Sequence, residues 1–148
     1  MVCGPDVYES TYRMGRLYLM VKQQFHVERY EVIVYYNLDY NLFNIVADEM
    51  YNAGADEELV SEVYYMLNSN KAKAVTYSNL DKHISIVLFN PHTSKRDYLN
   101  SIVHEAEHVK QAMLKVYQVE DKGEPPAYTI GYLVMKMYEV FRCLIFSK

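Results

Sequence analysis

The sequence predicts a single α+β domain, in which a small antiparallel or mixed sheet packs on helices and two long helices complete the C-terminus. Three observations support this fold. The length of 148 residues fits one domain, and 51% hydrophobic with 23% charged residues is an ordinary globular composition. A strand pair is expected at about 72–89, and the hydrophobic pattern then changes to helical spacing. Two strands followed by two helices at the C-terminus predict the α+β class.

The N-terminal half is expected to contribute a strand and two helices. Residues 13–27 are ambiguous between helix and strand, because 17–21 is continuously apolar. The segment 30–36 is rich in β-branched and aromatic residues, which is typical of a strand. Helical spacing follows at 42–51, which stops at a Gly-containing turn signal, and at 56–67, which starts with an acidic turn.

The C-terminal half carries the elements on which a site prediction depends. Two strands are expected at 72–77 and 83–89, joined by a turn. A helix then extends over about 94–117, with apolar residues spaced by three and four throughout. The last helix begins near Pro125, a residue suited to a first helical position, and extends to about 145.

Charge and cysteine content narrow the functional class. A net charge of −4 and a pI near 5.7 argue against a general nucleic-acid binder, which normally carries a basic face. The most apolar stretch, 130–146, contains three charged residues and therefore predicts a buried helix rather than a membrane span. Cys3 and Cys143 are too few for a disulfide framework and predict reduced thiols. We therefore expect a cytoplasmic protein with no nucleic-acid or membrane partner.

An H-E-x-x-H motif, His104-Glu105-Ala106-Glu107-His108, lies within the helix expected at 94–117. Positions four apart on a helix lie about 6 Å apart on one face, so two imidazoles can bind one Zn²⁺ at about 2.0–2.1 Å each. Glu105 can reach a zinc-bound water without binding the ion. The zinc lowers the pKa of that water toward about 7, and the carboxylate accepts its proton as it attacks a carbonyl. The motif thus predicts one Zn²⁺ per chain, with Glu105 as general base.

The third zinc ligand must be a carboxylate or come from upstream, because no histidine follows His108. Glu124 is the best candidate, since an antiparallel return of the last helix would bring it toward the histidines. Glu120 and Asp121, in the connection, are alternatives. Glu124 also has a purely structural explanation, because an acidic residue stabilises a helix N-terminus.

The H-E-x-x-H motif followed by Glu124-Pro125-Pro126-Ala127-Tyr128 resembles the gluzincin type of zincin metallopeptidase, and especially the compact HEXXH proteins of phages and mobile elements. The resemblance covers about 72–146 and implies a minimal zincin-like domain that hydrolyses peptide bonds. Only fifteen residues separate His108 from Glu124, fewer than in larger gluzincins, and that family's downstream acidic partner is missing. Tyr128 lies one helical turn beyond Glu124 in place of that acidic residue. It could stabilise an oxyanion or be a tyrosine at the edge of the core.

The same resemblance implies how a peptide or protein substrate would bind. In the zincin family, the strand before the motif helix is an edge strand that pairs with an extended substrate. Residues 83–89 would then line the cleft, with Ile84, Ile86 and Leu88 on one face. His92, in the following loop, could assist the substrate, although a solvated loop histidine is the simpler explanation.

Two further functions are compatible with this sequence. The chain could be a catalytically inactive zincin-like module that binds zinc and a partner, or a metal-free helical interaction protein in which the motif occurs by chance. A metal assay distinguishes the last of these from the other two. Activity toward peptides, with a Glu105→Gln control, distinguishes the peptidase from the inactive module.

Overall fold

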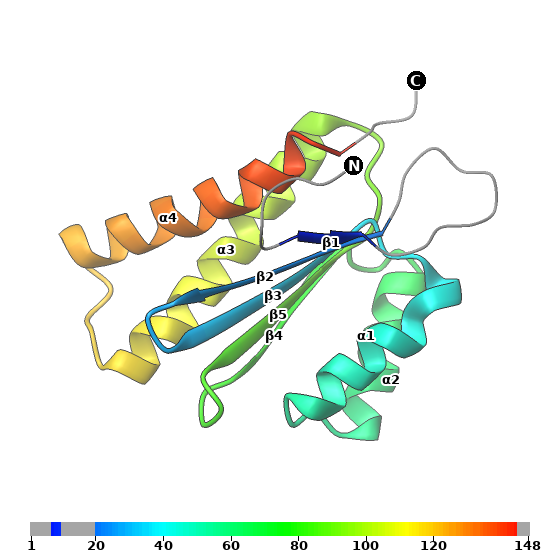
Figure 1. The fold of residues 1–148 in the computed structure, drawn as a ribbon, viewed down its shortest axis with the longest axis horizontal. Coiled ribbons are helices and arrows are strands. Elements are labelled where there is room, and N and C mark those ends of the chain that lie inside the picture. The colour runs from blue at the N-terminus through cyan, green and yellow to red at the C-terminus, as the bar shows by residue number, and fades with distance from the viewer. Residues whose placement is uncertain (1–6, 10–19, 145–148) are drawn as a thin grey trace.

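A computed structural model describes residues 20–144 and the backbone of 7–9, and it shows an α+β fold. One mixed sheet has helices on both faces, and the two long C-terminal helices pack on one of them (Figure 1). The strands are β1 (Val7–Glu9), β2 (Val21–Val27), β3 (Tyr30–Tyr36), β4 (Ala74–Asn79) and β5 (Ile84–Phe89). The helices are η1 (Tyr40–Leu42), α1 (Phe43–Asn52), α2 (Glu57–Asn68), α3 (Lys95–Tyr117) and α4 (Glu124–Phe141).

The strand order in the described part of the chain is β1-β2-β3-β5-β4. The strands β3 and β5 are parallel, whereas all other neighbouring pairs are antiparallel. A parallel pair needs a long crossover, which here contains α1, α2 and β4. The strand β5 is therefore central, and β4 lies at the edge of the sheet.

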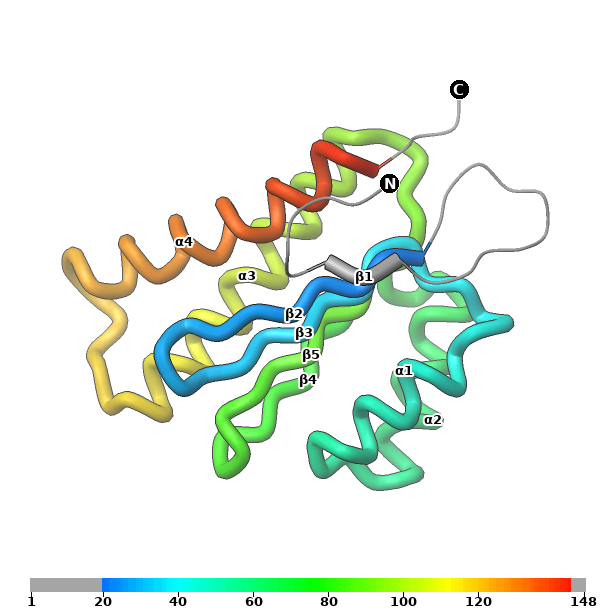
Figure 2. Tube along the Cα trace, viewed as in Figure 1, coloured from blue at the N-terminus to red at the C-terminus, as the bar shows by residue number. Residues whose placement is uncertain are grey.

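Both faces of the central strands are buried, so the fold has three layers. Val32, Val34 and Tyr36 of β3 face α3 and α4, whereas Ile33 and Tyr35 face α1 and α2. Strands that are covered on both sides read as nearly continuous apolar runs, and this explains the sequences YEVIVYY and ISIVLF. The tube in Figure 2 shows α1 and α2 on the opposite side of the sheet from α3 and α4.

The helix α3 positions the H-E-x-x-H motif. It begins after Ser94, whose side chain accepts a hydrogen bond from the backbone N–H of Asp97 at 3.1 Å. Apolar residues along one stripe then bury this helix against the sheet, namely Ile102, Ala106, Val109 and Met113. The helix α4 runs back along α3, so that the rings of Tyr98 and Phe141 meet at 5.7 Å near the start of one helix and the end of the other (Figure 1).

Several sequence-based expectations can be compared with this fold. The predicted strands and helices are confirmed to within a few residues, and the ambiguous segment 13–27 forms a strand at 21–27, while 13–19 lies outside the described residues. The expectation of a reduced thiol at Cys143 is wrong, because this residue is in a disulfide. A count of two cysteines carries no information about their distance in the fold. Within 20–144, no helix combines the length and apolarity needed to cross a membrane.

Candidate metal centre

His104 and His108 converge on the solvent-exposed side of α3. Their Nε2 atoms are 3.3 Å apart, and the side chain of His104 is 68% exposed. Two nitrogen ligands at 2.0–2.1 Å from a tetrahedral Zn²⁺ would be separated by about 3.3–3.4 Å. The two imidazoles therefore already have the separation that a shared zinc ion requires.

Glu105 lies between the histidine pair and the edge strand β4. It is 5% exposed, and its Oε1 atom accepts a hydrogen bond from the hydroxyl of Thr76 at 2.7 Å. Its Oε2 atom is 4.0 Å from Nε2 of His104. One carboxylate oxygen is thus held by the sheet while the other faces the first histidine, the side on which a general base has to act.

Glu107, the other carboxylate of the motif, is engaged elsewhere. Its Oε2 atom pairs with Nζ of Lys110 at 2.9 Å and accepts a hydrogen bond from Gln111 at 3.1 Å. Lys110 in turn reaches Asp121 at 3.0 Å. Glu107 therefore belongs to an ion-pair group that ties α3 to the α3–α4 connection, and it provides an internal control for Glu105.

The structure does not bring Glu124 to the histidines, so the predicted three-residue ligand set is not assembled. Among residues 20–144, no group of three His, Cys, Asp or Glu side chains is placed to hold a metal ion. The alternatives are also engaged elsewhere, since Asp121 pairs with Lys110 and Glu120 pairs with Lys122 at 3.0 Å.

Helix geometry explains why Glu124 is not grouped with the histidines in this structure. The helix α3 continues nine residues beyond His108, about 13 Å, before the chain turns, and α4 starts at that far end. The connection also approaches another face of α3. At about 100° per residue, Lys110, which holds Asp121, lies roughly 200° around the helix from His108. Tyr128, one turn after Glu124, is 73% exposed.

The prediction that residues 83–89 form a free edge strand for the substrate is wrong. This segment contains β5, which is paired on both sides, with β3 and with β4. Ile84, Ile86 and Leu88 do share a face, but that face is the core under α1 and α2. The edge position belongs to β4, and Thr76 on this strand is the site residue that the sequence analysis missed. The edge position of β4 left a signal in the sequence, because a nearly continuous apolar run such as 84–89 is typical of a central strand, whereas Ala-Val-Thr-Tyr-Ser-Asn alternates. The contact of Thr76 with Glu105 left no such signal.

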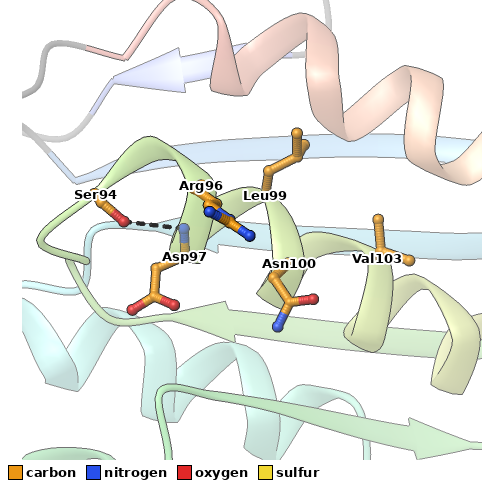
Figure 3. Close-up of a pocket in the computed structure, with 6 residues that line it drawn as sticks. All are labelled: Ser94, Arg96, Asp97, Leu99, Asn100 and Val103. Carbon is orange, nitrogen blue, oxygen red and sulfur yellow. Dashed lines mark hydrogen bonds between the residues drawn. The ribbon is translucent and has the colours of Figure 1, made fainter.

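A shallow hollow follows α3 from its N-terminus to the turn before the histidines (Figure 3). Its volume is about 530 Å³, and it is lined by Ser94, Arg96, Asp97, Leu99, Asn100 and Val103. Leu99 and Val103 point toward α4, whereas Asp97 and Asn100 point the other way (Figure 3). Asn100 lies one helical turn before His104, so the hollow ends next to the candidate metal centre.

His92 lies in the connection between β5 and α3, where it is half-buried, and it is not part of the histidine pair. Its Nδ1–H donates to the carbonyl of Asn90 at 2.7 Å, so Nε2 accepts from the hydroxyl of Ser101 at 2.8 Å. The ring also stacks on Tyr98, with centroids 4.3 Å apart. These contacts anchor the start of α3.

We expect His92 to make the stability of the protein depend on pH. Burial is the main cause that lowers the pKa of His92, with a smaller contribution from Lys73, while the Asn90 carbonyl and Asp97 oppose it. A lowered pKa in the folded state means that the unfolded chain binds the proton more readily. The stability contributed by neutral His92 is therefore present above about pH 6.5 and is lost as the pH falls through the folded-state pKa. Urea midpoints measured between pH 7.5 and 5 should fall more steeply for the native protein than for His92→Gln, and parallel curves would contradict this.

The chain matches no protein-family model, no curated protein and no solved structure in the three comparisons made.

Proposed function

We propose that the chain is a zinc-dependent metallopeptidase in which His104 and His108 hold the ion and Glu105 is the general base. The observation that carries the proposal is the 3.3 Å separation of the two Nε2 atoms, with the buried carboxylate of Glu105 beside them. Imidazole nitrogens are ligands that Zn²⁺ favours, and this separation suits two positions of a tetrahedral site. The histidine pair can therefore fill two of the four ligand positions around the ion.

Glu105 would perform the proton transfers of hydrolysis. The bound zinc would supply Lewis-acid polarisation and an acidified water. Glu105 would accept a proton from the attacking water while the carbon–oxygen bond forms, and would return it to the nitrogen as the peptide bond breaks. Its position supports this role, because Oε2 lies on the histidine side and Oε1 is held by Thr76.

The edge strand β4 supports a peptide as the substrate class. In the described part of the chain it pairs only with β5, so its outer N–H and C=O groups have no strand partner. An extended peptide can add to such an edge through backbone hydrogen bonds. Thr76 connects this strand directly to Glu105, so a peptide added to this edge would lie near the proposed base.

The proposal is tested by incubating the zinc-loaded protein with a peptide library and detecting cleavage by mass spectrometry. Cleavage is expected from the zinc-loaded protein, and it should disappear after treatment with a chelator and return on adding zinc. Cleavage that survives complete removal of metal would contradict the proposal.

A zinc-binding module without catalytic activity is the second candidate. One observation favours it: no third ligand joins His104 and His108 among the described residues. This candidate predicts zinc binding that depends on both histidines, together with no cleavage of any peptide in the library.

A further inference from the structure

We propose that Thr76 is a positioning residue for Glu105, which means that the edge strand itself sets the orientation of the general base. This inference rests on the proposed function for its catalytic part. Its structural part, the coupling of Thr76 to Glu105, stands independently of any activity. The key contact is the 2.7 Å hydrogen bond from Oγ1 of Thr76 to Oε1 of Glu105.

Burial makes this hydrogen bond important. Glu105 is 5% exposed, so its carboxylate has lost most of its contact with water. A buried acceptor without a donor is costly, and hydrogen bonds to ionised groups are stronger than neutral ones. Thr76 supplies a donor from a neighbouring element, since a carboxylate can only accept.

The position of Thr76 on β4 gives the contact its direction. Thr76 pairs with Val87 of the central strand β5, and this pairing fixes the register of Thr76 in the sheet. Its hydroxyl engages only one of the two oxygens of Glu105, and the other lies 4.0 Å from Nε2 of His104. A rotation of the Glu105 side chain that moved Oε2 away from the histidine would break the bond to Thr76. The strand thus selects the orientation in which Oε2 is available for proton transfer.

One strand would therefore serve two steps of the reaction. The outer edge of β4 would pair with the peptide, and its Thr76 side chain would hold the base on the face toward α3. A peptide docked on this edge would then be positioned by the same element that positions Glu105. Enzymes depend on such fixed relative geometry between substrate and catalytic group.

The catalytic part is tested with Thr76→Val, Thr76→Ser and a matched control, Ser78→Ala. Valine keeps the shape of threonine without its hydroxyl, serine keeps the hydroxyl, and Ser78 is two residues along the same strand but bonds Ser85 at 2.7 Å instead of Glu105. We expect Thr76→Val to lower kcat about 10–100-fold, as the loss of an orienting partner typically does, with KM nearly unchanged. Thr76→Ser and Ser78→Ala should keep kcat within about threefold, because the bond to Glu105 remains.

The structural part is tested on the metal-free protein by urea unfolding. Thr76→Val should lower the urea midpoint in the native background but leave it nearly unchanged in a Glu105→Ala background, where the acceptor is already missing. Ser78→Ala should instead shift the midpoint equally in both backgrounds. Additive effects of Thr76→Val and Glu105→Ala would overturn the inference.

The two measurements distinguish failure of this inference from failure of the proposed function. If the effects of Thr76→Val and Glu105→Ala on the urea midpoint were non-additive but Thr76→Val left kcat unchanged, the positioning role would be overturned. The proposed peptidase activity would still stand. A native protein that cleaves no peptide would overturn the proposed function, and the urea cycle would still decide whether Thr76 holds Glu105. A fall in kcat that Thr76→Ser does not restore would also contradict the inference, since it would assign the effect to packing.

Discussion

Replacing Glu105 by glutamine is expected to lower kcat for peptide hydrolysis by about 10²–10⁴-fold, the usual contribution of a general base. The amide of glutamine cannot accept the proton of the attacking water, yet it has nearly the same size and can still accept the hydrogen bond from Thr76. Zinc affinity should stay close to that of the native protein, because both imidazole ligands are retained. Steady-state kinetics together with zinc titration measures both quantities.

Glu107→Gln provides the matched control for this prediction. The same chemical change is made two residues away in the same helix, at a carboxylate that pairs with Lys110 rather than facing the histidines. We expect its kcat to remain within about threefold of the native value, because it takes no part in the proton transfer. If both variants lost activity equally, Glu105 would not be the base, and the inactive zinc-binding module would be the better account.

Replacing His104 by alanine is expected to remove both zinc binding and hydrolysis. One of the two converging nitrogens is lost, and the remaining imidazole of His108 is an exposed single ligand. The metal-free variant should nevertheless unfold at nearly the native urea midpoint, since the His104 side chain is 68% exposed and both histidines belong to one helix. Zinc titration, peptide cleavage and urea unfolding of the same preparation test the three parts.

His26→Ala is the control for the histidine variant. His26 is an exposed histidine of β2, on a different element from the motif, so its removal should change neither zinc binding nor cleavage. Retention of tight zinc binding by His104→Ala would place the metal elsewhere and contradict the assignment of the histidine pair.

The elements that local patterns specify were predictable from this sequence. The helix α3 could be recognised from its spacing by three and four, and Asp56 and Ser94 cap α2 and α3 as residues of their type commonly do. Helical periodicity also places His104 and His108 on one face, because positions four apart are neighbours in any α-helix. The convergence of the two histidines thus depends on local geometry alone.

The remaining features depend on contacts between distant segments. Whether 84–89 is an edge or a central strand is decided by its parallel pairing with β3, which lies more than fifty residues earlier. The location of Glu124 depends on the length of α3 and on which face the connection approaches. The contact of Thr76 with Glu105 joins residues 29 positions apart, so no local pattern could reveal it.

Buried tyrosines give another example of this limit. Sixteen tyrosines in the sequence indicate a bias without saying which of them are internal. Among the residues that the structure describes, Tyr30, Tyr35, Tyr36 and Tyr98 are almost completely buried. Each hydroxyl has a hydrogen-bond partner, and Gln23 shows how specific these partners are, since it accepts from Tyr36 at 2.6 Å and donates to the backbone of α4 at Lys136. Such pairs are set by the packing of the layers.

The central claim, that the H-E-x-x-H helix holds a metal ion, is tested most directly by elemental analysis of the purified protein after equilibration with Zn²⁺ and removal of unbound metal. The account predicts one zinc ion per chain in the native protein and none in a variant with His104 and His108 both replaced by alanine. The absence of zinc from the native protein, or an equal zinc content in the double variant, would contradict it.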